Sequence, residues 1–118
     1  MWEGAPALQR TLDMRFTRFT LVDPERGERL TCDVRLRFAA PGGAAGRLVA
    51  GAAIVESKSR AGGATADRAL RGLGVRPIAG CSKYCLGVGQ TYPQVKSNSF
   101  RPLLRHYFEV DHGLLAAG

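Results

Sequence analysis

The clearest pattern in the chain is a strict alternation of apolar and polar positions over residues 29–38. Apolar side chains occupy every second position from Leu30 to Phe38. Successive side chains of a strand point to opposite faces, so the pattern predicts a half-buried β-strand. We therefore expect the polar residues between them to form one continuous row on a single face: Arg29, Thr31, Asp33, Arg35 and Arg37.

Two further strands are expected on either side of this one. Residues 13–22 are rich in Phe, Thr and Val, and the turn sequence DPERGE at 23–28 joins them to 29–38. The two runs are therefore expected to form a β-hairpin. A glycine-rich loop at 40–46 leads to a third expected strand over 48–58, which is apolar at first and ends in Glu56-Ser57-Lys58.

Two helices are expected after the strands. Residues 65–73 have apolar positions at helical spacing, with Thr65 as the N-cap and Gly74 as the terminator. Ser82 is placed to cap a second, short helix. The tail from residue 98 has no clear period. These elements predict an α+β protein built on an antiparallel sheet.

Composition and charge narrow the class of partner. The chain has 118 residues, of which 45% are hydrophobic, so it is expected to fold as one small domain or as a piece of a larger one. Seventeen Lys and Arg against ten Asp and Glu give a formal charge of +7. This surplus indicates a polyanionic partner: nucleic acid, an acidic membrane surface or free polyphosphate.

The compartment is expected to be the cytoplasm. The first ten residues lack a signal-peptide pattern, and no apolar run is long enough to span a membrane, so no transmembrane segment is expected. Three cysteines, an odd number, are typical of a reduced protein.

Three groups of residues are candidates for chemistry, and each has two interpretations. The polar row of 29–38 is either a solvated sheet face or a wall that grips phosphates. Glu56 and Lys58 are either an ion pair at a strand edge or a metal-holding carboxylate beside a phosphate-holding amine. Lys83 would lie in the first turn of a helix, which the helix dipole disfavours. An anion bound there would remove the conflict, and the alternative is that Lys83 extends into water.

Other sites are disfavoured. Cys81 and Cys85 lack zinc-ligand spacing, and His106 and His112 are expected at the surface. Neither a P-loop nor a dinucleotide-binding glycine motif is present. Nucleic acid is disfavoured as a partner because the polar row has no aromatic side chain on which bases would stack.

The order of motifs resembles the C-terminal half of the vacuolar transporter chaperone (VTC) domain, the polyphosphate polymerase domain of the triphosphate tunnel metalloenzymes. The motifs are FTRFTL, ERLTCDVRLRF, IVESKS, LRGLGVRPI, CSKYCLGV and FRPLLR, which cover roughly residues 14–107. The most specific piece is Ser82-Lys83-Tyr84-Cys85 after the E-x-K strand and a short helix. Residues 1–118 are therefore expected to be a partial VTC-like domain.

The resemblance implies part of an antiparallel β-barrel lined with charged groups, with short helices packed outside. It implies phosphoryl transfer from a nucleoside triphosphate to polyphosphate with Mg²⁺ or Mn²⁺. Glu56 would hold the metal, and Glu56 and Lys83 would be the catalytic residues. The phosphate-binding residues would be Arg18, Arg29, Arg35, Arg37, Lys58, Ser82 and Lys83.

The chain departs from the family in two ways. An acidic position of the family motif is Arg35 here, and the N-terminal strands that close the barrel would lie outside the chain. The half-barrel would leave open strand edges, so a homodimer or a complementing chain is expected. Two alternatives stay open: an inactive polyanion-binding remnant and a small basic nucleic-acid-binding domain.

Overall fold

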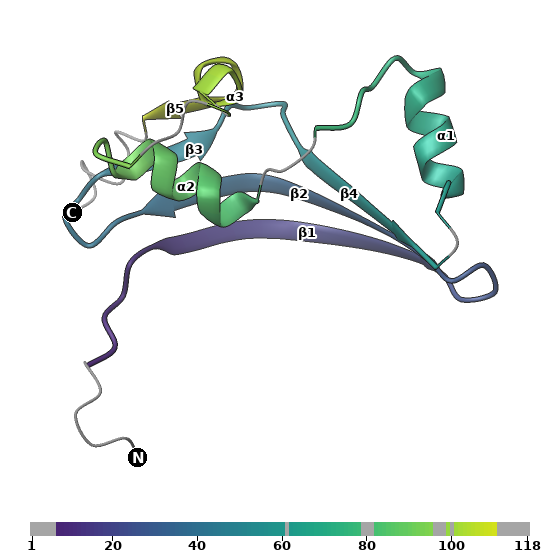
Figure 1. The fold of residues 1–118 in the computed structure, drawn as a ribbon, viewed down its shortest axis with the longest axis horizontal. Helices are drawn as coiled ribbons and strands as arrows, with labels where there is room; N and C mark the ends of the chain where they lie inside the picture. Colours follow the sequence, from purple (N-terminus) through teal and green to yellow (C-terminus); the bar gives the residue numbers. More distant parts are fainter. Residues whose placement is uncertain (1–6, 61, 79–81, 96–98, 100, 111–118) are drawn as a thin grey trace.

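The computed structural model describes residues 7–60, 62–78, 82–95, 99 and 101–110. Within these residues the chain forms an α+β fold with an antiparallel sheet, as predicted (Figure 1). The elements in order are β1 (Asp13–Asp23), β2 (Glu28–Ala39), β3 (Ala45–Leu48), β4 (Ile54–Ser59), α1 (Thr65–Gly72), α2 (Lys83–Thr91), α3 (Arg101–Tyr107) and β5 (Phe108–Val110).

β2 is the centre of the sheet. It pairs with β1 along one side, which confirms the predicted hairpin. Along its other side, residues 28–33 pair with β4 and residues 37–39 pair with β3, which in turn pairs with β5. In the part of the chain that the structure describes, β1 and β4 pair only with β2, so the sheet is open and does not close into a barrel.

A β-bulge divides β2 into two halves. Arg15 pairs with Arg37 and Thr17 pairs with Val34, so β2 has one extra residue opposite Phe16. Arg35 has φ of 57°, the left-handed region that such an extra residue can adopt. The extra residue shifts the alternation by one position, and side chains beyond the bulge therefore exchange faces relative to those before it.

The core lies on the face of the sheet that α2 covers, which we call the α2 face (Figure 1). Leu36 and Phe38 of β2 are fully buried there. They pack with Leu48 of β3, Leu86 of α2 and Phe108 of β5. The rings of Phe38 and Phe108 stack with centroids 5.8 Å apart. The tail, which had no clear period, thus supplies α3 and a strand that completes the core.

The opposite face, which we call the α1 face, has little cover. α1 reaches it through a hydrogen bond between Ser57 and Asp67, and through the Glu28 carboxylate, which accepts the Thr65 N–H at 3.2 Å. Phe19 and Leu21 are 60% and 67% exposed there.

Three local predictions need correction. The expected strand over 48–58 is two strands, because the chain turns between them at Gly51, whose φ is 83°. Thr65 is not the N-cap of α1; Ala64 occupies that position and makes no side-chain cap bond. The carboxylate of Glu28 instead accepts the N–H of Thr65. The predicted end of this helix is confirmed, since Gly74 has φ of 82° and donates to the Arg71 carbonyl at 3.0 Å.

Candidate anion-binding site

The half of the α2 face nearest the β1–β2 turn is polar. We call its charged side chains, together with Thr31 between them, the polar patch. Cross-strand pairing positions them, since opposed residues of antiparallel strands share a face. Arg18 pairs with Asp33, Thr31 with Glu56, and Arg29 with Lys58. The first turn of α2 adds one more residue, and the patch therefore consists of Arg18, Arg29, Thr31, Asp33, Glu56, Lys58 and Lys83.

Asp33 is the hub of the patch. Its side chain is 1% exposed and binds two cations. Arg18 donates to it in a bidentate arrangement, Nε to Oδ1 at 2.7 Å and Nη2 to Oδ2 at 2.9 Å, and the Nζ of Lys83 lies 2.8 Å from Oδ2. The hydrogen bonds from Arg18, followed by those from Lys83, lower the pKa of Asp33 from 3.8 to about 2. The same carboxylate raises the pKa of Arg18.

The N-terminus of α2 is fixed on the sheet by this contact. The hydroxyl of Ser82 accepts the Cys85 N–H at 3.1 Å, so Ser82 caps the helix as predicted. The Lys83 side chain is 18% exposed. The ammonium of Lys83 therefore does not extend into water, and its partner is not an external anion. The anion at this helix terminus is the carboxylate of Asp33. Lys83 and Arg18 also lie over the Phe16 ring, 5.4 and 5.2 Å from its centroid.

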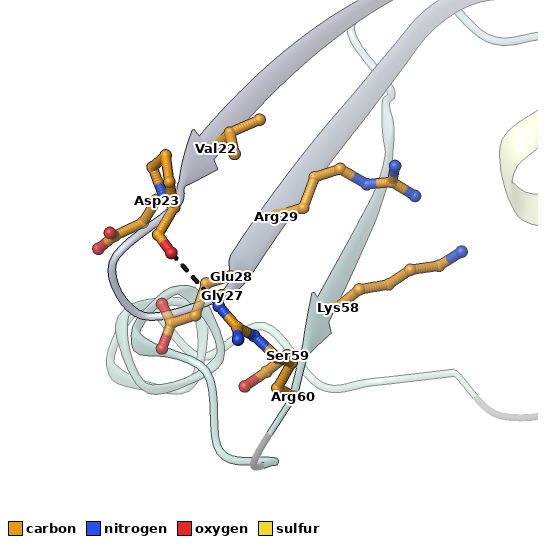
Figure 2. Close-up of a pocket in the computed structure, with 9 residues that line it drawn as sticks. Val22, Asp23, Gly27, Glu28, Arg29, Lys58, Ser59 and Arg60 are labelled. Atoms are coloured by element: carbon orange, nitrogen blue, oxygen red, sulfur yellow. Dashed lines mark hydrogen bonds between the residues drawn. The ribbon is translucent and has the colours of Figure 1, made fainter.

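Arg29 and Lys58 provide the open part of the patch. Figure 2 shows them extending from β2 and β4 to the same side of the sheet. Within the described residues the Arg29 side chain has no hydrogen bond or ion pair, and Lys58 has only a loose contact with Glu56, Nζ to Oε1 at 3.9 Å. With Arg18, Thr31 and Glu56 they line a hollow of about 50 Å³.

A second hollow of about 430 Å³ continues from the patch to the hairpin end. Arg29 and Lys58 line both hollows. At its far end the guanidinium of Arg60 donates to the Pro24 carbonyl at 3.3 Å, which ties β4 to the β1–β2 turn (Figure 2). The two hollows together form a shallow path with the same two cations at its middle.

The residues fit a divalent metal only in part. Mg²⁺ takes one or two carboxylates together with substrate phosphates. On the polar patch Glu56 is the carboxylate with an open side, because Asp33 is occupied by Arg18 and Lys83. In the described ranges no three His, Cys, Asp or Glu residues cluster as metal ligands. A metal at Glu56 would therefore need phosphate oxygens as most of its ligands.

The structure brings together most, but not all, of the predicted site residues. Arg18, Arg29, Glu56, Lys58 and Lys83 share the α2 face. Ser82 caps α2 beside them, with its hydroxyl accepting a backbone N–H.

The prediction of one continuous arginine row is wrong. Arg37 lies beyond the bulge, between the buried Leu36 and Phe38, and its side chain is therefore on the α1 face. Arg35 is the exposed bulge residue itself and does not continue the row of Arg29, Thr31 and Asp33.

Two residues of the site could not be predicted from the sequence. Alternation places Asp33 in the polar row but does not show that it holds two cations. Phe16 lies two residues before Arg18, and this spacing places both side chains on one face of β1. Of the other candidates, His106 is exposed and Cys85 is a free thiol, whereas Cys81 and His112 lie outside the described residues.

Comparison of the chain with protein-family models, curated proteins and solved structures gave no match. The resemblance to the VTC domain stays an expectation from the sequence motifs. Among the described residues no helix is long and apolar enough to cross a membrane.

Proposed function

We propose that the polar patch binds a linear series of phosphates, either polyphosphate or the triphosphate of a nucleotide. We further propose that the protein is a phosphoryl-transfer module of the triphosphate-tunnel type. The carrying observation is the pair Arg29 and Lys58, which face each other across β2 and β4 with little neutralisation. The patch contains four cations, and Asp33 and Glu56 are its two acids. A polyanion would balance the excess of positive charge.

The spacing of the cations supports a linear anion. Lys58 and Arg29 are directly opposed on β4 and β2, so they can hold neighbouring phosphates across these two strands. Arg18 lies on the same face of β1, opposite Asp33 and four residues along β2 from Arg29, so a linear anion would reach it by running diagonally across the sheet. The guanidinium groups also match phosphate oxygens in bidentate geometry.

The residues present have distinct roles in such a reaction. Phosphoryl transfer depends mainly on positioning and on stabilising charge that develops on oxygen. Arg29 and Lys58 would orient the phosphates, and Arg18 would contribute charge while it holds Asp33. Glu56 would hold Mg²⁺ or Mn²⁺ together with the substrate, and the metal when bound would neutralise phosphate charge. Lys83 acts as a positioning residue, since it fixes α2 against the patch.

An inactive polyanion-binding module is the second candidate. It is favoured by the commitment of Asp33 to Arg18 and Lys83, which leaves Glu56 as the open carboxylate of the patch. The open sheet also leaves one side of the site without a wall. A nucleic-acid-binding role has less support, because the ring of Phe16 is approached by Arg18 and Lys83 instead of being free for base stacking.

The location we propose is the cytoplasm. The thiols of Cys32 and Cys85 are both free, which agrees with a reducing compartment.

The first experiment measures phosphate release and polyphosphate synthesis from ATP with Mn²⁺, comparing the wild type with Glu56→Ala. Metal-dependent turnover that the substitution abolishes would support phosphoryl transfer. If the wild type shows no turnover but still binds polyphosphate, the result would support the inactive polyanion-binding module.

Binding is measured separately by titration with polyphosphate. Lys58→Ala is expected to weaken it severalfold, because it removes one of the two open cations. Arg68→Ala on the exposed side of α1 is the matched control, since it removes the same charge far from the patch and should bind as the wild type does. Equal binding by Lys58→Ala and the wild type would contradict the site.

A further inference from the structure

The outer side of β1 is an open strand edge with properties of an interaction surface. β1 has 11 residues and pairs only with β2 among the described strands, whereas the open strands on the other side of β2, β4 and β5, have 6 and 3 residues. Figure 1 shows β1 as the outermost strand. β1 contains no Pro, Gly or Lys, although Pro and Lys commonly protect such edges. Its backbone is therefore available to a further strand.

A row of arginines on the α1 face ends at this edge. Arg37 stands opposite Arg15 on one side and Arg47 on the other, and Arg47 stands opposite Glu109. Like charges directly opposed across strands are unfavourable, and an acid beside the row relieves this. At the β5 end Glu109 accepts from the Nε of Arg47 at 2.7 Å. At the β1 end no described strand lies beyond Arg15 to provide an equivalent acid.

We propose that two copies of this chain pair through antiparallel β1 strands, with Phe19 opposite Phe19 of the partner subunit. A two-fold axis normal to the sheet keeps each side chain on its own face, so opposed residues must share a face. The axis must therefore lie midway between one residue of β1 and the same residue of the partner subunit. With the axis at Phe19, Arg15 lies opposite Asp23 of the partner subunit. This pair occurs twice, and the arginine row then has an acid at both ends.

Other positions of the axis are less complementary. An axis at Arg18 opposes Arg18 with its own copy and sets Asp13 against Asp23. An axis at Thr17 sets Arg15 against Phe19. An axis at Thr20 sets Arg15 opposite a residue of the partner subunit's β1–β2 turn, beyond the end of β1. Of these four registers, the one centred on Phe19 is the one that places opposite charges, and two exposed aromatic rings, opposite each other within the strand.

Pairing in this register joins the two sheets into one. The symmetry places both polar patches on the same side of the joined sheet, so each copy extends the basic surface of the other. The dimer itself is independent of the anion that the patch binds, and its test uses no phosphate ligand.

The first test measures the mass in solution by sedimentation. The expected result for the wild type is twice the chain mass of 12.7 kDa. Arg15→Asp sets two acids against each other at both ends of the interface and should raise the dissociation constant by roughly tenfold or more. Asp23→Arg should do the same, and the double variant Arg15→Asp/Asp23→Arg should restore the dimer. Thermal unfolding of each variant checks that it is folded, since Asp23 also accepts the Arg26 N–H in the turn.

The second test determines the register by cross-linking, with Cys32, Cys81 and Cys85 replaced by Ser. Phe19→Cys should form a disulfide across the axis on mild oxidation, because opposed residues have close Cβ atoms. Thr17→Cys is the control and should not, since it faces Leu21 of the partner subunit. A monomeric wild type, a swap that fails to restore the dimer, or cross-linking by Thr17→Cys in place of Phe19→Cys would each overturn the proposal. If the wild type is a monomer, the partner that pairs with the β1 edge would instead be a strand of a different protein.

Discussion

Asp33 has an environment that its position in the sequence does not indicate. It is a carboxylate in a strand of alternating arginines, and it is almost fully buried between two cations from β1 and α2. A buried acid of this kind stabilises the fold only while both partners hold it. Removing one member of a buried ion pair leaves an uncompensated charge.

Asp33→Asn is expected to lower the free energy of unfolding by about 2–3 kcal/mol, because Arg18 and Lys83 keep their charges and lose their acceptor. Urea denaturation measures the change. Asp13→Asn is the matched control. Asp13 contacts Arg10 at 3.4 Å on the surface, and its loss should change stability by less than about 0.5 kcal/mol. Equal effects of the two substitutions would contradict the role of Asp33.

Lowering the pH should weaken the interaction of Asp33 with Arg18 and Lys83. The pKa of Asp33 is lowered from 3.8 in the unfolded chain to about 2 in the folded protein. Its stabilising contribution is therefore fully present above about pH 4 and is lost as the pH falls toward 2, a difference of about 2 kcal/mol. Unfolding free energies measured between pH 5 and pH 2 should fall less steeply for Asp33→Asn than for the wild type. Parallel curves would mean that Asp33 titrates normally.

At the scale of elements, the packing of α2 on β2 decides the shape of the site. α2 approaches the sheet at Gly87, where a Cβ atom would lie 2.5 Å from the Cδ1 of Phe38 and 2.6 Å from the Cδ2 of Leu12. This close approach brings the first turn of α2, and with it Lys83, within reach of Asp33.

Gly87→Ala is therefore expected to destabilise the protein by about 1–3 kcal/mol through overpacking, although Ala is the better helix former. Gly72→Ala in α1 is the control, because nothing lies within 4 Å of the added atom, and it should be neutral or stabilising by up to about 1 kcal/mol. Chemical denaturation of the two variants compares them. A stable Gly87→Ala variant would show that α2 can move away from the sheet without loss.

The elements that could be predicted are those with a local signal. The hairpin follows from alternation and a turn sequence, and the start of α2 follows from Ser82. The bulge could not be predicted, because the letters of residues 34–37 continue the alternation through it. What turns Leu36 and Phe38 toward α2 is packing against residues about 50 positions further along the chain. The contact of Asp33 with Lys83 depends on that same docking and has no local signal.

At the scale of the whole molecule, the sheet separates two kinds of surface. One end of the α2 face is the core and the other end is the polar patch, while the α1 face exposes apolar side chains near the β1 edge. Glu56 and Lys58 could be predicted to share a face, because positions i and i+2 of one strand point the same way. Their alignment with Arg29 depends on the cross-strand register, which could not be read from the sequence.

Polyphosphate binding should be sensitive to salt, because cations that contact phosphates release counterions from the polyanion. The slope of log affinity against log salt should become shallower by about one in Arg29→Ala and in Lys58→Ala. Arg68→Ala should keep the wild-type slope. Titrations at several NaCl concentrations measure it, and an affinity that does not change with salt would contradict an electrostatic site.

The bulge at Arg35 makes the chain unusually sensitive to changes in length. One extra residue sets which face of the sheet the side chains of each half of β2 occupy. Deletion of a single codon there would therefore exchange the two faces along one half of the strand. Either Leu36 and Phe38 would turn to water, or Arg29 and Asp33 would leave α2. Natural variation in this protein should therefore tolerate substitution at position 35 far better than deletion.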